Sequence, residues 1–549
     1  MLLVATRYFA LIQICLLFLF ALYIVGVLDP QTISRFRSRR SGSKGRVLGS
    51  PSTWKSPAPG EDTSQYGEET LGHNNPVARD RGHKNDTIHQ GEVEVEVEVE
   101  VEDDDQPEKA GTIDEGPKHN QTQNLLAKAR ILIPSILDPA NTSIDRMSCP
   151  RINTARYSYL RPAPSMRIEI TRDTRRKYIF TLNLHQCVDL LPRLMGSVVE
   201  AIRFLSPQRC GVSIVEGNSD DGTLEVLRLL RKELADMGVA FWLSTSSLNP
   251  NESPDRIKYL ALLHNMALEQ VLGPPASCHP PIIQEDMDMA RSSLQHFKQD
   301  DDPEFDDEPH RHILGKDRKD PANPAALSPD ATIVFINDIL PCAEDLLELV
   351  HQRILQSADM VCALDFRYTN ETDPSDAATF YDVWVARTLT GDLFFDIPPS
   401  TGGWEHSAHL FPTEPIATRS RFEAGLPFQV FSCWNGAVAF AARPLVQGTR
   451  FRWPMKGECF RGEPQLFCKD LWSAGFGRIA VVPSVNLGYT DMDGRRVKQE
   501  KGFVSDFVSK EKEMMLIDWQ REPPEQVKCM PGFKDQTWRS WNESLTGGG

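Results

Sequence analysis

The chain has 549 residues, of which 40% are hydrophobic, so it is long enough to bury a large core. Its formal net charge of −16 at pH 7 argues against nucleic acid as a partner, because nucleic-acid-binding domains are usually basic. Part of that charge lies in one stretch, EVEVEVEVEVEDDD at residues 92–105, and therefore does not indicate an acidic binding face.

An apolar segment lies close to the N-terminus. Tyr8 to Leu28 spans 21 residues, and Gln13 is its one strongly polar side chain. This is about the length that a helix needs to cross a bilayer. A cleaved signal peptide is the alternative, but no clear cleavage site with small residues follows. We expect residues 1–28 to form a cytoplasmic tail and a signal-anchor helix, which places the chain in a membrane as a single-pass type II protein.

The orientation of this anchor is argued from two opposing patterns. Basic residues follow the apolar segment, and the positive-inside rule would place them in the cytosol. Six Asn-x-Ser/Thr triplets and ten cysteines beyond the anchor indicate the secretory lumen instead, where glycosylation and disulfides form. We therefore expect a lumenal catalytic part. The expected glycosylation sites are Asn85, Asn120, Asn141, Asn251, Asn370 and Asn542.

Residues 29–174 are rich in Gly, Pro, Ser and charge, and the sequence predicts a disordered, low-complexity stem. The alternation at residues 92–105 has the period of a strand, but its dense like charge opposes collapse. Such a stem would hold a folded domain away from the membrane.

Strands and helices alternate from about residue 175. The patterns predict strands at 178–184, 212–216 and 239–243, each followed by a helix, and later strands near 333–336, 360–366 and 478–483. This alternation predicts an α/β domain over 175–549, with a mostly parallel sheet and helices on both faces. Residues 273–330, rich in Pro, Asp and His, interrupt it and are expected to form a mobile insertion.

Polar residues stand where four predicted strands end. They are Asn183, Glu216, the pair Asn337-Asp338, and Asp365. Each alone suits a turn or a helix cap. Together they predict a ligand site, because open parallel sheets bind ligands beyond the carboxyl ends of their strands.

Transfer of a sugar from a nucleotide diphosphate fits this set. A divalent cation held by one or two carboxylates can neutralise the leaving diphosphate. Asp338 is the expected ligand for this divalent cation, and Asn337 either ligates weakly or orients Asp338. The alternative is a turn without a metal. No P-loop and no Gly-x-Ser-x-Gly motif is present, which disfavours phosphoryl transfer of the P-loop kind and hydrolysis by a serine elbow.

An ordered set of motifs resembles the fungal capsule-associated α-1,3-mannosyltransferases, glycosyltransferase family 69. The motifs lie between Lys177 and Asp491 and read FTLNLHQCVDLLP, IVEGNSDDGT, RIKYLALLHNMAL, VFINDI, ALDF, FYDVWVARTLTGD, SCWNG and CKDLW. The resemblance implies a GT-A-like (Rossmann-like) fold and a type II Golgi protein. It also implies transfer of mannose from GDP-mannose to an α-mannoside or polysaccharide acceptor, with Mn²⁺ or Mg²⁺ and retention of configuration.

The resemblance also implies roles for individual residues. Asn337-Asp338 stands where related enzymes carry Asp-x-Asp. The expected nucleotide-sugar contacts, with the strand-end residues included, are Asn183, Glu216, Asp221, Arg256, Lys258, Asn265 and Asp365. This chain departs from the family at His264-Asn265, where an Arg-Asn pair is usual, and in the length of its insertion.

The later half of the domain supplies candidate acceptor residues, because sugars present an apolar face and many hydroxyls. These candidates are Asp382, Trp384, Arg387, Trp434 and Asn435, with core packing as the alternative for both tryptophans. Glu463 and Asp470 are catalytic candidates that would orient the acceptor hydroxyl or the reacting carbon, and surface ion pairs are their alternative. Cys459 and Cys468 could form a disulfide. A catalytically inactive glycan-binding protein on the same fold is the alternative function, and a membrane-tethered scaffold acting through its stem is a third.

Overall fold

The structure is a computed structural model, and it describes residues 117–162, 175–253, 255–273, 294–296, 327–370, 373, 376–400, 407, 409–459, 461–509 and 515–545. Chain contacts divide the protein into two units, residues 1–71 and 72–549, and all described residues lie in the second. The predicted anchor at residues 8–28 is outside the described residues. Within them, no helix has both the length and the apolarity that a membrane span requires.

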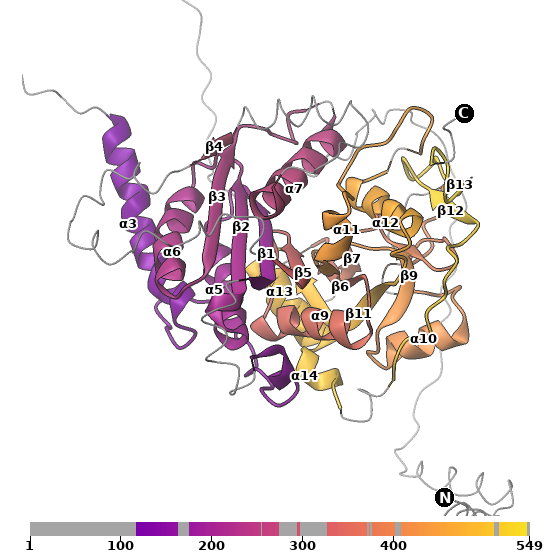
Figure 1. Ribbon diagram of the computed structural model, residues 1–549, viewed down its shortest axis with the longest axis horizontal. Coiled ribbons are helices and arrows are strands. Elements are labelled where there is room, and N and C mark those ends of the chain that lie inside the picture. The colour runs from indigo at the N-terminus through magenta and orange to yellow at the C-terminus, as the bar shows by residue number, and fades with distance from the viewer. Residues whose placement is uncertain are drawn as a thin grey trace, which may run out of the picture. The chain divides into compact units, whose positions relative to one another are not determined.

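One large sheet organises the described part of the domain (Figure 1). Its eleven strands include ten in the spatial order β4-β3-β2-β1-β5-β10-β6-β11-β9-β8, and β7 pairs with β6. Their bounds are β1 Arg176–Leu184, β2 Cys210–Glu216, β3 Ala240–Ser246, β4 Leu294–His296, β5 Leu327–Ile336, β6 Met360–Arg367, β7 Thr379–Phe380, β8 Arg387–Thr388, β9 Phe428–Ser432, β10 Ala437–Ala441 and β11 Ile479–Gly488. A separate two-stranded sheet pairs β12 Gln526–Cys529 with β13 Thr537–Ser540.

The centre of the large sheet is parallel. Strands β3, β2, β1 and β5 run in one direction, and β6 pairs in parallel with β11. Strand β10 is antiparallel to both β5 and β6 and lies between them. Since β5 and β6 both oppose β10, they run in the same direction as each other. The prediction of an α/β domain with a mostly parallel sheet is confirmed.

Side chains alternate across the sheet and fill two separate apolar clusters. On β5, Ile333 and Phe335 belong to the cluster that includes the apolar side chains of α7 (Arg256–Leu272) and α12 (Glu463–Ser473). Val334 and Ile336 point to the opposite face, where the second cluster includes residues of α5 and α9. The remaining helices that cover the sheet or flank it are α3 Pro117–Leu137, α5 Leu191–Leu205, α6 Thr223–Asp236, α9 Ala343–Leu355, α10 Ile416–Glu423, α11 Ala442–Val446, α13 Asp491–Lys501 and α14 Val504–Phe507.

The predicted stem at residues 29–174 includes residues that belong to the folded domain. Residues 117–137 form helix α3, which lies beside α5 and α6 (Figure 1). Its side chains Ala129, Leu132 and Ile136 are buried in the second cluster. We call residues 141–160 the strap. Tyr157 in the strap is fully buried, and its hydroxyl donates to Glu348 Oε2 at 2.9 Å. The folded domain therefore begins before residue 175, and the stem boundary at 174 is wrong.

Three disulfides join distant parts of the described chain. They are Cys149–Cys342, Cys362–Cys433 and Cys459–Cys529. The suggested Cys459–Cys468 bond is wrong, because Cys468 is a buried free thiol on α12 while Cys459 is bonded to the strand β12. Most of the predicted insertion at 273–330 lies outside the described residues. Its residues 294–296 form β4, which pairs with β3, and its last residues begin β5.

Candidate functional site

The polar residues that end the central strands come to one edge of the sheet. The register aligns Leu184 with Glu216 across β1 and β2, and Leu182 with Ile336 across β1 and β5. Val438 on β10 is opposite both Phe335 and Cys362, so Asp365 on β6 is about level with Asp338. This is the edge at which parallel sheets bind ligands.

Three hydrogen bonds hold Asn337 in place. Its backbone N–H donates to Gly436 O at 2.9 Å, and its carbonyl accepts from Ile339 N at 2.9 Å. Its Oδ1 accepts a hydrogen bond from Trp434 Nε1 at 3.0 Å. The segment 434–436 lies beside Asn337 because Asn435 and Gly436 both adopt a positive φ, at 55° and 80°, which Asn and Gly tolerate best.

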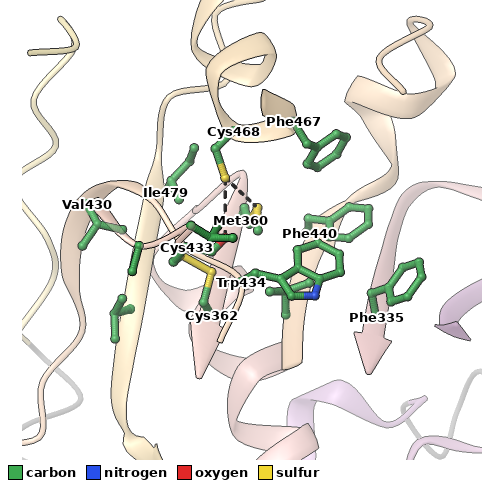
Figure 2. Close-up of a cluster of buried hydrophobic side chains, with 14 of the residues drawn as sticks. Phe335, Met360, Cys362, Val430, Cys433, Trp434, Phe440, Phe467, Cys468 and Ile479 are labelled. Carbon is green, nitrogen blue, oxygen red and sulfur yellow. Dashed lines mark hydrogen bonds between the residues drawn. A yellow bond between two sulfur atoms is a disulfide. The ribbon is translucent and has the colours of Figure 1, made fainter. Parts of the chain in front are cut away.

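The indole of Trp434 is part of a cluster of aromatic rings. Its centroid is 5.3 Å from that of Phe335, 5.4 Å from that of His264 and 5.4 Å from that of Phe451. Figure 2 shows the indole extending from the segment of Cys433 towards Phe335. Only 3% of Trp434 is exposed. The prediction that Trp434 contacts the acceptor is therefore wrong, and it packs in the core, which was the alternative.

Arg256 supplies a positive charge near the carboxyl ends of the central strands. It opens helix α7, and burial lowers its pKa, while Glu463, Tyr381 and Asp338 oppose the lowering. These three residues therefore lie within electrostatic reach of the guanidinium, which also donates to Asn251 Oδ1. A half-buried cation at a helix N-terminus is a suitable neighbour for an anionic ligand.

Glu463 is a carboxyl group near Arg256 with a strongly raised pKa. It is 4% exposed, and burial raises its pKa to about 8, although the backbone and Arg256 act in the opposite direction. Its Oε1 lies 3.5 Å from Nδ1 of His264, whose own pKa burial lowers to about 3. At neutral pH the favoured state of the pair is a carboxylic acid beside a neutral imidazole, which can offer a hydrogen-bond donor but no strong base.

Two carboxyl groups, those of Asp365 and Asp382, lie near the end of β6. Asp365 is fully buried, and its Oδ2 accepts from the Tyr489 hydroxyl at 2.6 Å. Burial raises the pKa of Asp365, and the nearby Asp382 raises it further. Burial also raises the pKa of Asp382, to about 6, and Asp382 Oδ2 accepts from Asn435 N at 2.8 Å. Two adjacent carboxyls of this kind favour sharing a proton.

Several predicted nucleotide contacts instead hold the protein together. The carboxylate of Glu216 accepts from the backbone of Asn218 and Ser219, and it is fully buried. Asp221 accepts from the backbone N–H of Val188 and of Thr223, and so joins two loops. These bonds are those of turn and cap residues, which was the alternative interpretation for Glu216.

The amides of Asn183 and Asn265 also contact protein. Asn265 is 1% exposed, donates to Phe451 O at 2.8 Å and accepts from Phe451 N at 3.0 Å, so its prediction as a diphosphate contact is wrong. Asn183, with its amide oriented to satisfy both atoms, accepts from His264 N and donates to Leu182 O. Lys258 lies with Nζ 5.1 Å from the centroid of the Trp453 ring.

The structure also revises most of the acceptor and catalytic candidates in the later half. Asp470 forms a two-point ion pair with Arg452, at 2.7 and 2.9 Å, and is therefore a structural residue. Arg387 is 1% exposed and donates to the carbonyls of Val383, Ala386 and Lys528. Asn435 is fully buried and donates to Ala363 O, and the Trp384 ring packs 4.9 Å from Phe533. Asp382 and Glu463 are the two candidates that remain near the site, within electrostatic reach of Asp365 and Arg256 respectively.

Sequence reasoning missed Tyr489, Tyr381 and His264 as members of the site. Tyr489 follows β11, whose carboxyl end lies at the same edge, so the strand-end rule applied to that strand would have found it. His264 was noted only as a departure from the family pattern. No local signal places it beside Glu463, because the two residues come from different helices.

The residues present fit one kind of divalent cation site. Within the described part of the chain, no group of three or more His, Cys, Asp or Glu side chains could hold a metal ion. The described residues therefore contain no metal site formed by protein side chains alone. Mg²⁺ and Mn²⁺ in nucleotide sites need only one or two carboxylates, because substrate phosphates and waters complete the shell. Asp338, partly exposed at the end of β5, meets that requirement.

Comparison with known proteins gives a family and one related enzyme. The family model described as Cryptococcal mannosyltransferase 1 matches residues 177–470. The chain is 30% identical over 384 residues to alpha-1,3-mannosyltransferase CMT1 of Cryptococcus neoformans var. neoformans serotype D, strain JEC21 / ATCC MYA-565. That similarity covers 66% of this chain and 70% of the relative.

Two solved glycosyltransferase structures are more distantly similar. The first is mannosyltransferase PcManGT from Pyrobaculum calidifontis in complex with GDP-Man and Mn²⁺, at 12% identity and a TM-score of 0.28, covering 66% of this chain and 68% of that one. The second is GalNAc-T7 with UDP, GalNAc and Mn²⁺, at 12% identity and a TM-score of 0.30, covering 70% and 56%.

The family match includes the carboxyl ends of β1, β2, β5 and β6, whereas β11 and Tyr489 follow its last residue. It also includes Arg256 and Glu463. The resemblance found in the sequence motifs is thereby confirmed, and the chain belongs to the cryptococcal mannosyltransferase 1 family of mannosyltransferases.

Proposed function

We propose that the protein transfers mannose from GDP-mannose to an α-mannoside or polysaccharide acceptor, forms an α-1,3 linkage, and retains the configuration at the transferred carbon. The relationship to an α-1,3-mannosyltransferase is the observation that carries this proposal, and the family match includes Asp338, Arg256 and Glu463. The arrangement of that edge supports it, since a carboxylate, a half-buried arginine and a helix N-terminus suit a nucleotide diphosphate. We propose a GT-A-like fold on the same grounds.

Asp338 would hold Mn²⁺ or Mg²⁺ in this proposal. The cation would supply charge neutralisation for the diphosphate that leaves. Arg256 adds a fixed positive charge on the same side, and its burial strengthens its interaction with a phosphate oxygen.

Glu463 contributes as an acid. Its raised pKa keeps the proton on the carboxyl at neutral pH, so it donates a hydrogen bond to a sugar oxygen or to His264. Asp382, with a pKa of about 6, is ionised to a larger extent at neutral pH and is the better candidate to accept a hydrogen bond from the acceptor hydroxyl.

The proposed location is the Golgi membrane, with the catalytic domain in the lumen. Three disulfides within the described residues support an oxidising compartment. The N-terminal segment at residues 8–28 would provide the membrane anchor.

The test is a transfer assay with the purified protein. Radiolabelled GDP-mannose, an α-mannoside and Mn²⁺ should give a longer, labelled product, and NMR of that product should show an α-1,3 linkage. GDP-fucose and UDP-glucose serve as control donors and should give no product. A protein that binds mannosides without turnover would instead support the inactive glycan-binding alternative, which the asparagine at position 337 makes worth testing.

A further inference from the structure

The side-chain amide of Asn337 has one orientation that the chemistry of its partner determines. An indole N–H can only donate, so the atom that faces Trp434 Nε1 at 3.0 Å must be the oxygen of the amide. The nitrogen of the same amide, Nδ2, must then point away from the indole. This assignment does not depend on how similar the two amide atoms look.

The indole is held in place by its neighbours. Trp434 is 3% exposed and contacts the rings of Phe335, His264 and Phe451. The backbone N–H of Asn337 is bonded to Gly436, two residues beyond the tryptophan. Because the side chain and the backbone of Asn337 are both bonded to segment 434–436, the amide cannot turn over without breaking the Trp434 bond.

The other end of the amide is open. Asn337 is partly exposed, and among the described residues nothing accepts a hydrogen bond from its Nδ2. Asn337 follows Ile333 and Phe335 in the alternation of β5, so it lies on the face of the sheet that α7 covers. Arg256, at the start of α7, is on that face too and lies within electrostatic reach of the neighbouring Asp338.

We infer that Asn337 is a hydrogen-bond donor to an anionic oxygen of the bound nucleotide diphosphate and not a metal ligand, and that Trp434 is the residue that positions it. This inference rests on the proposed function, because the diphosphate is that of the proposed donor. It gives a reason for the asparagine in place of an aspartate: a carboxylate would also accept from Trp434, but its other oxygen would repel a phosphate.

The experiment measures binding of GDP to the purified full chain by calorimetry, first in EDTA and then with Mn²⁺. Asn337→Ala should weaken metal-free binding by on the order of tenfold, which corresponds to one hydrogen bond to a charged group. Asn337→Asp should weaken it further, since it replaces the donor by a negative charge. Trp434→Phe keeps an aromatic ring but frees the amide, and it should give a loss no larger than that of Asn337→Ala.

Trp472→Phe is the matched control. Trp472 is 6% exposed, and its Nε1 donates to Phe431 O at 2.9 Å, so the substitution removes the same kind of bond from the same kind of environment. It should leave GDP binding unchanged. Melting curves for all four variants separate a loss of binding from a loss of folded protein.

The outcomes distinguish a failure of the proposed donor from a failure of the proposed role of Asn337. If the unaltered protein binds no GDP with or without Mn²⁺, the proposed donor and this inference fail together. If the unaltered protein binds GDP and the Asn337 variants bind it equally well in EDTA, this inference alone is wrong. It is also wrong if Asn337→Asp binds Mn²⁺ and GDP together more tightly than the unaltered protein, because that is the behaviour of a metal ligand.

Discussion

Glu463 Oε1 lies 3.5 Å from His264 Nδ1, and neither side chain is more than 8% exposed. Burial raises the pKa of Glu463 to about 8 and lowers the pKa of His264 to about 3. The contact is therefore one between two neutral groups at neutral pH and not an ion pair. A carboxyl group that stays protonated in this way can donate a hydrogen bond where an ionised one could not.

The raised pKa of Glu463 predicts a pH dependence of stability. The folded protein keeps a proton that the unfolded chain, with a pKa near 4.5, releases, so this residue makes the free energy of unfolding fall as pH rises from about 4.5 to about 8. Glu463→Gln removes this decrease in the free energy of unfolding, because glutamine does not titrate. The melting temperature of the variant minus that of the unaltered protein should increase with pH over this window, whereas exposed Glu233→Gln should show no trend. A flat difference for Glu463→Gln would contradict the raised pKa.

The proposed metal role of Asp338 predicts a large loss of turnover on substitution. Asp338→Ala and Asp338→Asn should each lower the rate of mannose transfer by on the order of 10²–10³-fold, the cost of removing one comparable electrostatic contact. Both variants should melt close to the unaltered protein, because a partly exposed residue at a strand end contributes little packing. The measurement is turnover against Mn²⁺ concentration. If Asp338 served only a turn, Asp338→Asn would be nearly silent, since Asn and Asp both suit turns.

Helix α3 predicts where the chain can be shortened. Removal of residues 1–116 should leave the melting temperature unchanged, because α3 stays intact. Removal of residues 1–140 also removes Leu132 and Ile136, which are buried against α5 and α6, and should cost about 3–6 kcal/mol. Chemical denaturation of the two truncated proteins measures the difference. Equal stability would show that α3 contributes nothing to the fold.

The Cys149–Cys342 bond predicts a further dependence on the strap. Cys342 is the N-cap of α9 and follows Asp338 by four residues, so the bond joins the strap to the loop that carries Asp338. Cys149→Ser should lower the free energy of unfolding by about 2–5 kcal/mol, the usual effect of losing a native disulfide. It should also raise the Mn²⁺ concentration needed for half-maximal turnover. Cys210→Ser, which alters a buried free thiol, is the control for the substitution itself.

The glycosylation triplets differ in how accessible they are. Asn251 and Asn370 are exposed. Asn141 is only partly exposed, and its Oδ1 accepts hydrogen bonds from Ser135 Oγ and from the backbone and hydroxyl of Ser143. Expression in a secretory host should therefore give glycans at Asn251 and Asn370 and little at Asn141, as read by mass spectrometry after glycosidase treatment. A protein without any glycan, and protease-sensitive in intact vesicles, would reverse the proposed topology.

The fold could be predicted in outline because its signals are local. Apolar runs located β1 and β2 to within a few residues, and the strand-end rule brought Asp338, Asp365 and Glu216 to one edge. Helix α3 was missed because Pro, Ser and charge dominate the composition around it, although Ala129, Leu132 and Ile136 have helical spacing.

Most individual roles could not be predicted, because distant partners decide them. Asn265 pairs with Phe451, which is 186 residues away, and nothing near either residue signals that bond. Asp470 suited either a catalytic carboxylate or an ion pair, and the 18 residues that separate it from Arg452 gave no signal that the two side chains pair. A polar residue at a strand end can contact a ligand or a loop, and sequence spacing does not distinguish these two cases.

Strand β10 has a consequence for how the site is assembled during synthesis. It lies between β5 and β6 although it follows both in the chain, so a ribosome must release about residue 441 before β5 can gain that neighbour. Strands β1, β2 and β3 can already pair at an earlier stage. Until β10 emerges, the backbone N–H of Asn337 lacks its Gly436 acceptor and the Trp434 indole is not in place. The nascent protein therefore completes its sugar-transfer site late, through long-range contacts that form slowly.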